Sequence, residues 1–315
     1  MRSGETGPEP MTDAAAERGA LLRASPSLAL GLFGVSWSAV LVRLAGAPAP
    51  VSAWWRVLFS LGLAVPLALR SGSRRVLARL SLRDWLDLAA SGLCLGLHLV
   101  LWFAAVRSTS VASATVLVSA TPVFVAVLSA LWFRERPAAG EWAGIVVAAA
   151  GSAVVGWADT GAAVGALRGD LLALVAAVAA ALYFVLGRRL RSRLGLWEYV
   201  TPVYVAAAVV ALAGVGTSGA ALTGYPAAAW LCFVGMAAGP MLLGHTSFNW
   251  ALGHVRAYVV SLVMLLEPLT ATFIAVLVLG PDEVPPAGSA LGAVVLLAGV
   301  SLVLRGRVRH SRSAA

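Results

Sequence analysis

The chain has 315 residues, of which 60% are hydrophobic and only 12% are charged, and its mean hydropathy is +0.89. Soluble domains carry roughly 25% charged residues, and a folded core cannot hide this much apolar surface from water. The composition therefore excludes an ordinary soluble domain and predicts an integral membrane protein. The net charge of +9 would suit a nucleic-acid-binding protein, a class that the positions of the arginines exclude below.

Ten apolar segments follow one another along the chain, each close to the roughly 20 residues that a helix needs to cross a bilayer. They are residues 27–45, 51–69, 85–106, 111–133, 141–158, 170–187, 199–216, 227–250, 257–279 and 287–304. The predicted fold class is all-α integral membrane, with ten transmembrane helices. Residues 1–26 are predicted to be a disordered cytoplasmic tail, and 306–315 a basic cytoplasmic tail.

The arginines are distributed unevenly between the two sides of the membrane. With the N-terminus inside the cell, alternation of the spans places 19 of the 23 basic residues inside and three outside, namely Arg43, Arg107 and Arg168. This asymmetry is the positive-inside rule. It predicts cytoplasmic N- and C-termini and excludes nucleic acid as a partner. Abundant Ala, Gly, Val and Arg, with no Lys, indicate a GC-rich bacterial genome and hence a bacterial cytoplasmic membrane.

The sequence contains an internal repeat. ERPAAGEWAGIVVAAAG (135–151) matches EVPPAGSALGAVVLLAG (283–299), with Glu, Pro and Gly in register at an offset of 148. Upstream, Pro122 matches Pro268 and Trp37 matches Tyr183 at an offset of 146. Residues 27–158 thus form a first repeat of five spans, and 169–305 a second.

Five spans per copy is an odd number, so the second copy enters the membrane from the opposite side. Inverted repeats of this kind are common in transporters, where the substrate site lies near the midplane between the copies. The pattern predicts a central cavity that opens alternately to each side. A duplication retained only for packing is the alternative.

At this point the sequence resembles the ten-helix EamA-type branch of the drug/metabolite transporter superfamily. The resemblance rests on both copies of Glu-x-Pro-x6-Gly-x6-Gly, on TPVF and EPLT, on Arg56 in SAWWRVLFS, and on FAAVRSTSVASA. It implies a basket of ten helices around a central cavity. It also implies a carrier, often an exporter of amino acids or related small molecules, whose partners are its substrate, membrane lipid and, where transport is coupled, protons.

Polar side chains inside the spans are the candidate cavity residues, because a central charge costs about 2.5–3.5 kcal/mol on insertion scales. They are Trp37, Arg56, His98, Trp102, Tyr183, His245, Asn249 and Glu267. His98 and Trp102 are four residues apart and share a helix face, as do His245 and Asn249. The alternative is that these groups are buried and hydrogen-bonded within tightly packed helices.

Two charged residues carry the most specific expectations. Glu267, beside Pro268, could bind a cationic amine, carry a coupled proton, or bridge helices. Arg56 could bind a substrate carboxylate or extend toward the membrane surface. Pro122, Pro240 and Pro268 are predicted to bend their helices.

Glycines four residues apart let helices approach closely. The predicted packing positions are Gly140, Gly144, Gly151, Gly288, Gly292 and Gly299.

Two other functional classes are weaker. An intramembrane enzyme or haem protein would have to use His98 and His245, and the sequence holds no catalytic motif. A non-transporting receptor or scaffold lacks a sensing domain in the sequence. No P-loop is present either, so we expect secondary transport without a cofactor or a metal.

Overall fold

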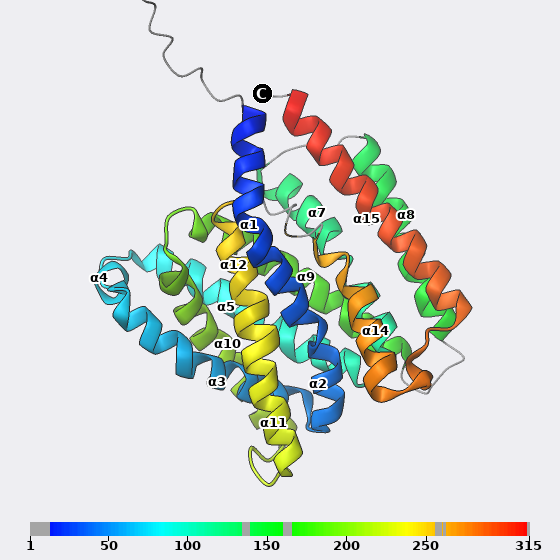
Figure 1. Ribbon diagram of the computed structural model, residues 1–315, viewed down its shortest axis with the longest axis horizontal. Coiled ribbons are helices and arrows are strands. Elements are labelled where there is room, and N and C mark those ends of the chain that lie inside the picture. The colour runs from blue at the N-terminus through cyan, green and yellow to red at the C-terminus, as the bar shows by residue number, and fades with distance from the viewer. Residues whose placement is uncertain (1–12, 134–138, 160–165, 256–259, 261–262, 314–315) are drawn as a thin grey trace, which may run out of the picture.

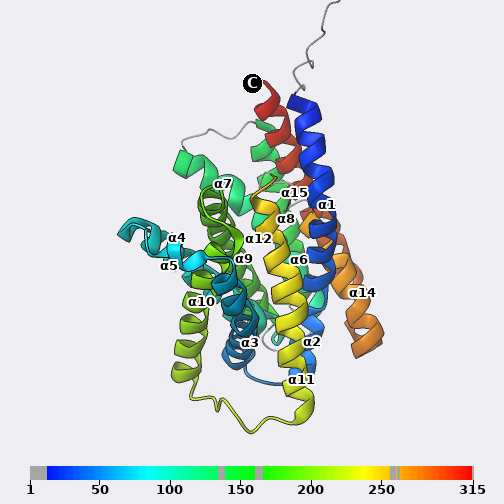
Figure 2. The same cartoon turned by 60° about the vertical axis from the view of Figure 1, so that its left-hand side comes forward.

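The computed structural model describes residues 13–133, 139–159, 166–255, 260 and 263–313, and these are mostly helical. The first half contains α1 (Asp13–Ser36), α2 (Ser38–Ala45), α3 (Ala49–Arg70), α4 (Ser73–Leu77), α5 (Leu82–Val106), α6 (Val111–Val118), α7 (Thr121–Phe133) and α8 (Ala139–Asp159). The second half contains α9 (Ala166–Arg191), α10 (Leu196–Ser218), α11 (Ala227–Met236), the π-helix η1 (Ala237–His245), α12 (Thr246–Leu252), α14 (Glu267–Leu279), the 3-10 helix η2 (Pro281–Glu283) and α15 (Ala287–Ser313). Figures 1 and 2 show their arrangement.

These elements account for the ten predicted spans. Three spans are built from more than one element: α1 with α2, α6 with α7, and α11 with η1 and α12. Within the described ranges, six helices or helix runs are long and apolar enough to cross a membrane, and four shorter helices are also apolar. The all-α integral membrane class is therefore confirmed. The start of the predicted span 257–279 lies largely outside the described residues.

Both ends of the helical bundle differ from their predicted boundaries. Helix α1 already begins at Asp13, inside the segment predicted as a disordered tail, and α15 continues to Ser313, through most of the predicted basic tail. Ala, Leu, Arg and Glu dominate residues 14–23, and these residue types favour helix. Arginine-rich residues 304–312 continue α15 in the same way. The apolar parts of these two helices, Leu22–Ala45 (with α2) and Ala287–Val303, stay close to the predicted spans.

The two copies pack against each other with inverted symmetry. The fifth spans lie side by side, as α8 and α15 do in Figure 1. The third span of each copy packs on the first span of the other, giving the contacts of α5 with α9 and of η1 with α1. The second spans, α3 and α10, also pack together. These contacts between the copies are symmetric, and the fold is two inverted five-helix repeats.

The contact between α8 and α15 depends on glycine. A Cβ at Gly144 would lie 2.6 Å from the backbone N of Val303, and one at Gly292 would lie 2.7 Å from the backbone N of Val155. Gly151, Gly288 and Gly299 face similarly close neighbours. Gly140 corrects the prediction, because no other helix among the described residues comes within 4 Å of its Cβ position. It sits at the exposed start of α8, before the two helices converge.

The start of α1 and the end of α15 lie at the same end of the molecule, and the loop between α10 and α11 lies at the opposite end (Figure 2). Together with the arginine distribution, this arrangement predicts that Arg191 and Thr217 lie on opposite sides of the membrane. Reporter domains fused after each residue are expected to be active on opposite sides, with the Arg191 fusion cytoplasmic. Activity of both fusions on one side would contradict the topology.

Candidate functional site

A cavity lies between the two copies. The first copy contributes Val35, Ser38, Arg56, His98, Leu99, Trp102, Val118 and Thr121, and the second contributes Ala180, Tyr183, Phe184, His245, Met264 and Glu267. Six of the eight candidate residues therefore line one space. Trp37 and Asn249 do not: Trp37 occupies the break between α1 and α2, and Asn249 lies behind Tyr183.

The third span of each copy contributes a histidine. His98 and Trp102 lie one turn apart on α5, with ring centroids separated by 6.5 Å and nearly parallel planes. The centroids of His98 and His245 are 6.1 Å apart. Nδ1 of His98 is 3.0 Å from the carbonyl oxygen of Ala176 on α9. The two imidazoles, matched in the repeat, thus face each other across the boundary between the copies.

His245 owes its position to an irregular helix. It ends the π-helix η1, which contains Gly239, Pro240 and Gly244. Proline removes a backbone hydrogen bond, and π-helical turns occur often at functional sites. The glycines also let α1 approach, since a Cβ at Gly34 would lie 2.6 Å from the backbone N of Gly244. The predicted irregularity at Pro240 therefore takes the form of a π-helix packed tightly on α1.

Arg56 is buried, with 1% of its surface exposed, although it is a permanently charged residue. Its Nη1 donates a hydrogen bond of 2.9 Å to Oγ of Ser38, and its guanidinium carbon lies 5.5 Å from the centre of the Phe103 ring. Nε has no hydrogen-bond partner, and no ion pair forms between Arg56 and any described carboxylate. Burying an unpaired cation is costly, so this arrangement favours a site that receives an anionic group.

Glu267 lies at the start of α14, with 6% of its surface exposed. Its counterpart in the first copy, Thr121, starts α7 in the same way. Pro122 and Pro268 follow as the second residues of these helices, and turns precede them at 119–120 and 265–266. Each copy thus interrupts its fourth span at a proline and places a polar side chain on the cavity. The prolines begin new helices here rather than bending continuous ones.

Asn249, Tyr204 and Thr246 form a second layer of polar groups behind the cavity. Tyr183 donates to Oδ1 of Asn249 at 2.7 Å, and the hydroxyl of Tyr204 lies 2.9 Å from Oγ1 of Thr246. The cavity-lining polar residues that were absent from the predicted set are Ser38 and Thr121. Thr121 could have been found from its repeat match to Glu267, whereas Ser38 resembles many other serines in the spans.

The cavity is narrow in this structure. Only about 30 Å³ of it admits the centre of a water-sized group, which is room for about two waters. A metabolite needs the lining helices to move apart. Among the described residues, no three His, Cys, Asp or Glu side chains gather closely enough to hold a metal ion.

Two inverted repeats around a cavity that carries several polar side chains define a membrane transporter of the inverted-repeat class. Residues 24–157 and 167–305 both match the EamA-like transporter family. The chain belongs to this family, and hence to the drug/metabolite transporter superfamily.

The chain is also similar to a curated protein in sequence and to a solved structure in fold. The chain is 26% identical over 194 residues to the "Uncharacterized transporter YdfC" of Bacillus subtilis (strain 168), covering 62% of each chain. A solved structure titled "Crystal structure of protein" superposes with a TM-score of 0.64 at 19% identity, covering 91% of this chain and 97% of the other. That likeness supports the fold.

Proposed function

We propose that this protein is a secondary transporter that exports amino acids or related small polar or amphipathic compounds across the bacterial cytoplasmic membrane. The observation that carries the proposal is a cavity between the repeats that places Arg56 and Glu267 on its wall. The α-carbon of an amino acid carries both a carboxylate and an ammonium group, and the cationic Arg56 and the acidic Glu267 match these two charges. Outward direction follows the resemblance to exporters, and the absence of a P-loop in the sequence favours secondary transport.

Unpartnered donors in the cavity support an acceptor-rich substrate. Nε of Arg56 and Nε1 of Trp102 are buried hydrogen-bond donors without partners, and Nδ1 of His245 is a third unpartnered nitrogen. Buried donors are normally satisfied, and a carboxylate can accept several hydrogen bonds at once. A substrate carboxylate bound at Arg56 would supply the missing acceptors.

Alternating access follows from the inverted symmetry. The two copies can exchange conformations, so that the cavity opens to one side and then to the other. The narrow cavity of this structure must widen to admit a substrate. Glu267 is the proposed proton-carrying residue where transport is coupled to a proton gradient.

The test is ligand protection against thermal unfolding of the purified protein, followed by transport in proteoliposomes. Amino acids are expected to raise the melting temperature, because a ligand at 100 times its Kd stabilises the native state by about 2.7 kcal/mol. Sugars and dyes are expected to have no effect. Stabilisation by sugars or dyes, and not by amino acids, would contradict the proposed substrate class.

Arg56→Gln removes the cation and keeps a polar, though shorter, side chain. We expect at least a tenfold loss of affinity for amino acids, since a charge-assisted bidentate contact is worth about 1.5–3 kcal/mol. Arg107→Gln, at an exposed arginine after α5, is the matched control and is expected to bind normally. Unchanged amino-acid affinity in a folded Arg56→Gln protein would exclude this carboxylate contact.

A further inference from the structure

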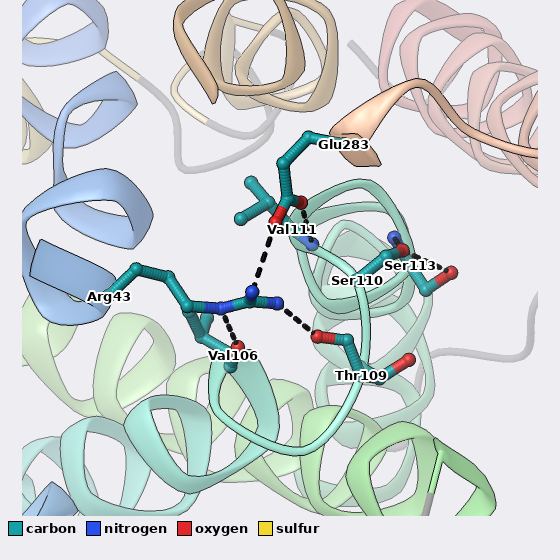
Figure 3. Close-up of polar contacts among 7 residues, drawn as sticks. All are labelled: Arg43, Val106, Thr109, Ser110, Val111, Ser113 and Glu283. Carbon is teal, nitrogen blue, oxygen red and sulfur yellow. Dashed lines mark hydrogen bonds and ion pairs between the residues drawn. The ribbon is translucent and has the colours of Figure 1, made fainter. Parts of the chain in front are cut away.

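An arginine at the end of the first span makes contacts at the outer mouth of the bundle (Figure 3). Arg43 lies in the last turn of α2. Its Nε donates to the carbonyl oxygen of Val106 and its Nη2 to that of Thr109, both at 2.5 Å. Its Nη1 lies 3.0 Å from Oε1 of Glu283. All three guanidinium nitrogens are therefore engaged.

The second carboxylate oxygen of Glu283 contacts the turn between α5 and α6, which Arg43 also contacts. Oε2 of Glu283 accepts a hydrogen bond of 3.1 Å from the backbone N–H of Val111, the first residue of α6. Helix ends leave backbone groups without partners. Here Arg43 donates to carbonyl oxygens at the end of α5 and in the turn, and Glu283 accepts from the N–H at the start of α6. Ser110 caps α6 beside it, accepting from the N–H of Ser113 at 3.0 Å (Figure 3).

The ion pair joins the two copies. Arg43, Val106 and Val111 belong to the first copy, whereas Glu283 belongs to η2, between α14 and α15 of the second. The packing around it is dense, because Val42, Val106 and Val111 are fully buried. The two copies are thus tied together at the end of the bundle that the arginine distribution places outside the cell.

A related contact recurs at the other end. Nη1 of Arg188, near the end of α9, donates to the carbonyl oxygen of Val255 at 3.0 Å. Val255 matches Thr109 at the repeat offset of 146, and Arg188 lies one position from the match of Arg43. Each copy therefore holds the turn after its third span with an arginine from its first span. At the outer end, the arginine also forms an ion pair with Glu283 of the other copy.

We propose that Arg43 and Glu283 form an outer latch, which holds the cavity closed to the outside and must break for it to open there. The proposal rests on the proposed alternating access. Opening the outer mouth separates the ends of the two copies, and among the described residues this pair is the ion pair across that boundary. Its side chains are 28% and 11% exposed, so water can reach them. A partly exposed pair can separate into water, whereas breaking a fully buried pair leaves charges without solvent.

The test measures access to the cavity from each side. Cys94 and Cys232 are free and are replaced by Ser, and Val35→Cys adds a reporter thiol on the cavity wall. A membrane-impermeant thiol reagent is applied to right-side-out and inside-out vesicles. Glu283→Gln is expected to speed labelling from outside about tenfold, equivalent to about 1.4 kcal/mol, and to slow labelling from inside. Asp282→Asn, at the exposed carboxylate beside Glu283 in η2, is the matched control and should label like the parent.

A cross-link supplies the reverse test, which does not depend on weakening the fold. In the same cysteine-free background, Arg43→Cys and Glu283→Cys are joined by a bifunctional methanethiosulfonate. We expect transport to stop, ligand-induced thermal stabilisation to persist, and a reductant to restore transport. Unchanged outside labelling in folded Glu283→Gln, or continued transport by the fully cross-linked protein, would overturn the latch. A parent protein that transports nothing would instead overturn the proposed function.

Discussion

Glu267→Gln is expected to abolish gradient-driven accumulation of substrate while exchange of substrate across the membrane continues. Glutamine preserves the size and polarity of the side chain but cannot release a proton. The carboxyl group is buried on the cavity wall. A change of its charge there alters its electrostatic interaction with a bound substrate. Proteoliposomes with an imposed pH gradient measure accumulation, and counterflow of labelled substrate measures exchange. We expect accumulation to fall at least tenfold, a loss of about 1.4 kcal/mol or more.

One control variant and one further measurement separate the roles proposed for Glu267. Glu198→Gln, at a carboxylate that accepts a hydrogen bond from Ser73, should accumulate substrate normally. A role in binding the substrate amine would instead lower the affinity for amines and spare neutral analogues. Normal, pH-dependent accumulation by Glu267→Gln would remove both functional roles and leave the residue with a structural one.

Gly144→Val is expected to destabilise the protein by about 1–3 kcal/mol, the usual cost of overpacking. A Cβ at this position would meet the backbone N of Val303 at 2.6 Å and the carbonyl oxygen of Gly299 at 2.7 Å. Both are backbone atoms of α15, which cannot rotate away as a side chain can. The helices must therefore separate along the α8–α15 contact. Thermal unfolding in detergent measures the loss.

Gly140→Val is the matched control for this substitution. Gly140 lies one turn before Gly144 on the same helix, and no other helix in the described part of the chain comes within 4 Å of its Cβ position. Both substitutions replace a glycine of α8 with the same β-branched residue, and the variants differ mainly in the contact with α15. Equal melting temperatures for the two variants would show that close approach of α8 and α15 does not contribute to stability.

Much of the candidate site could be predicted from the sequence, because polar residues are rare in membrane spans and usually have a function there. His98, His245 and Glu267 lie in otherwise apolar spans, where the free-energy cost of placing an ionisable side chain in lipid marks them as candidates. The repeat then indicated which of them occupy matched helices. Trp37 was included by the same logic and lies outside the cavity, because the match of Trp37 to Tyr183 fixes only their equivalent positions along the chain. It does not fix the direction of a side chain at the break between α1 and α2.

The sequence by itself determined the all-α membrane class, the ten spans and the two inverted copies. Hydropathy and arginine placement can be read directly along the chain, because the bilayer constrains both strongly. The repeat is found by comparing the chain with itself. Only the tertiary structure decided that η1 is a π-helix and that Arg56 and Glu267 share one cavity. It also decided that Arg43 of one copy meets Glu283 of the other, 240 residues away along the chain. Such pairings depend on how ten helices pack against each other, and packing depends on the shapes of all the side chains at each contact.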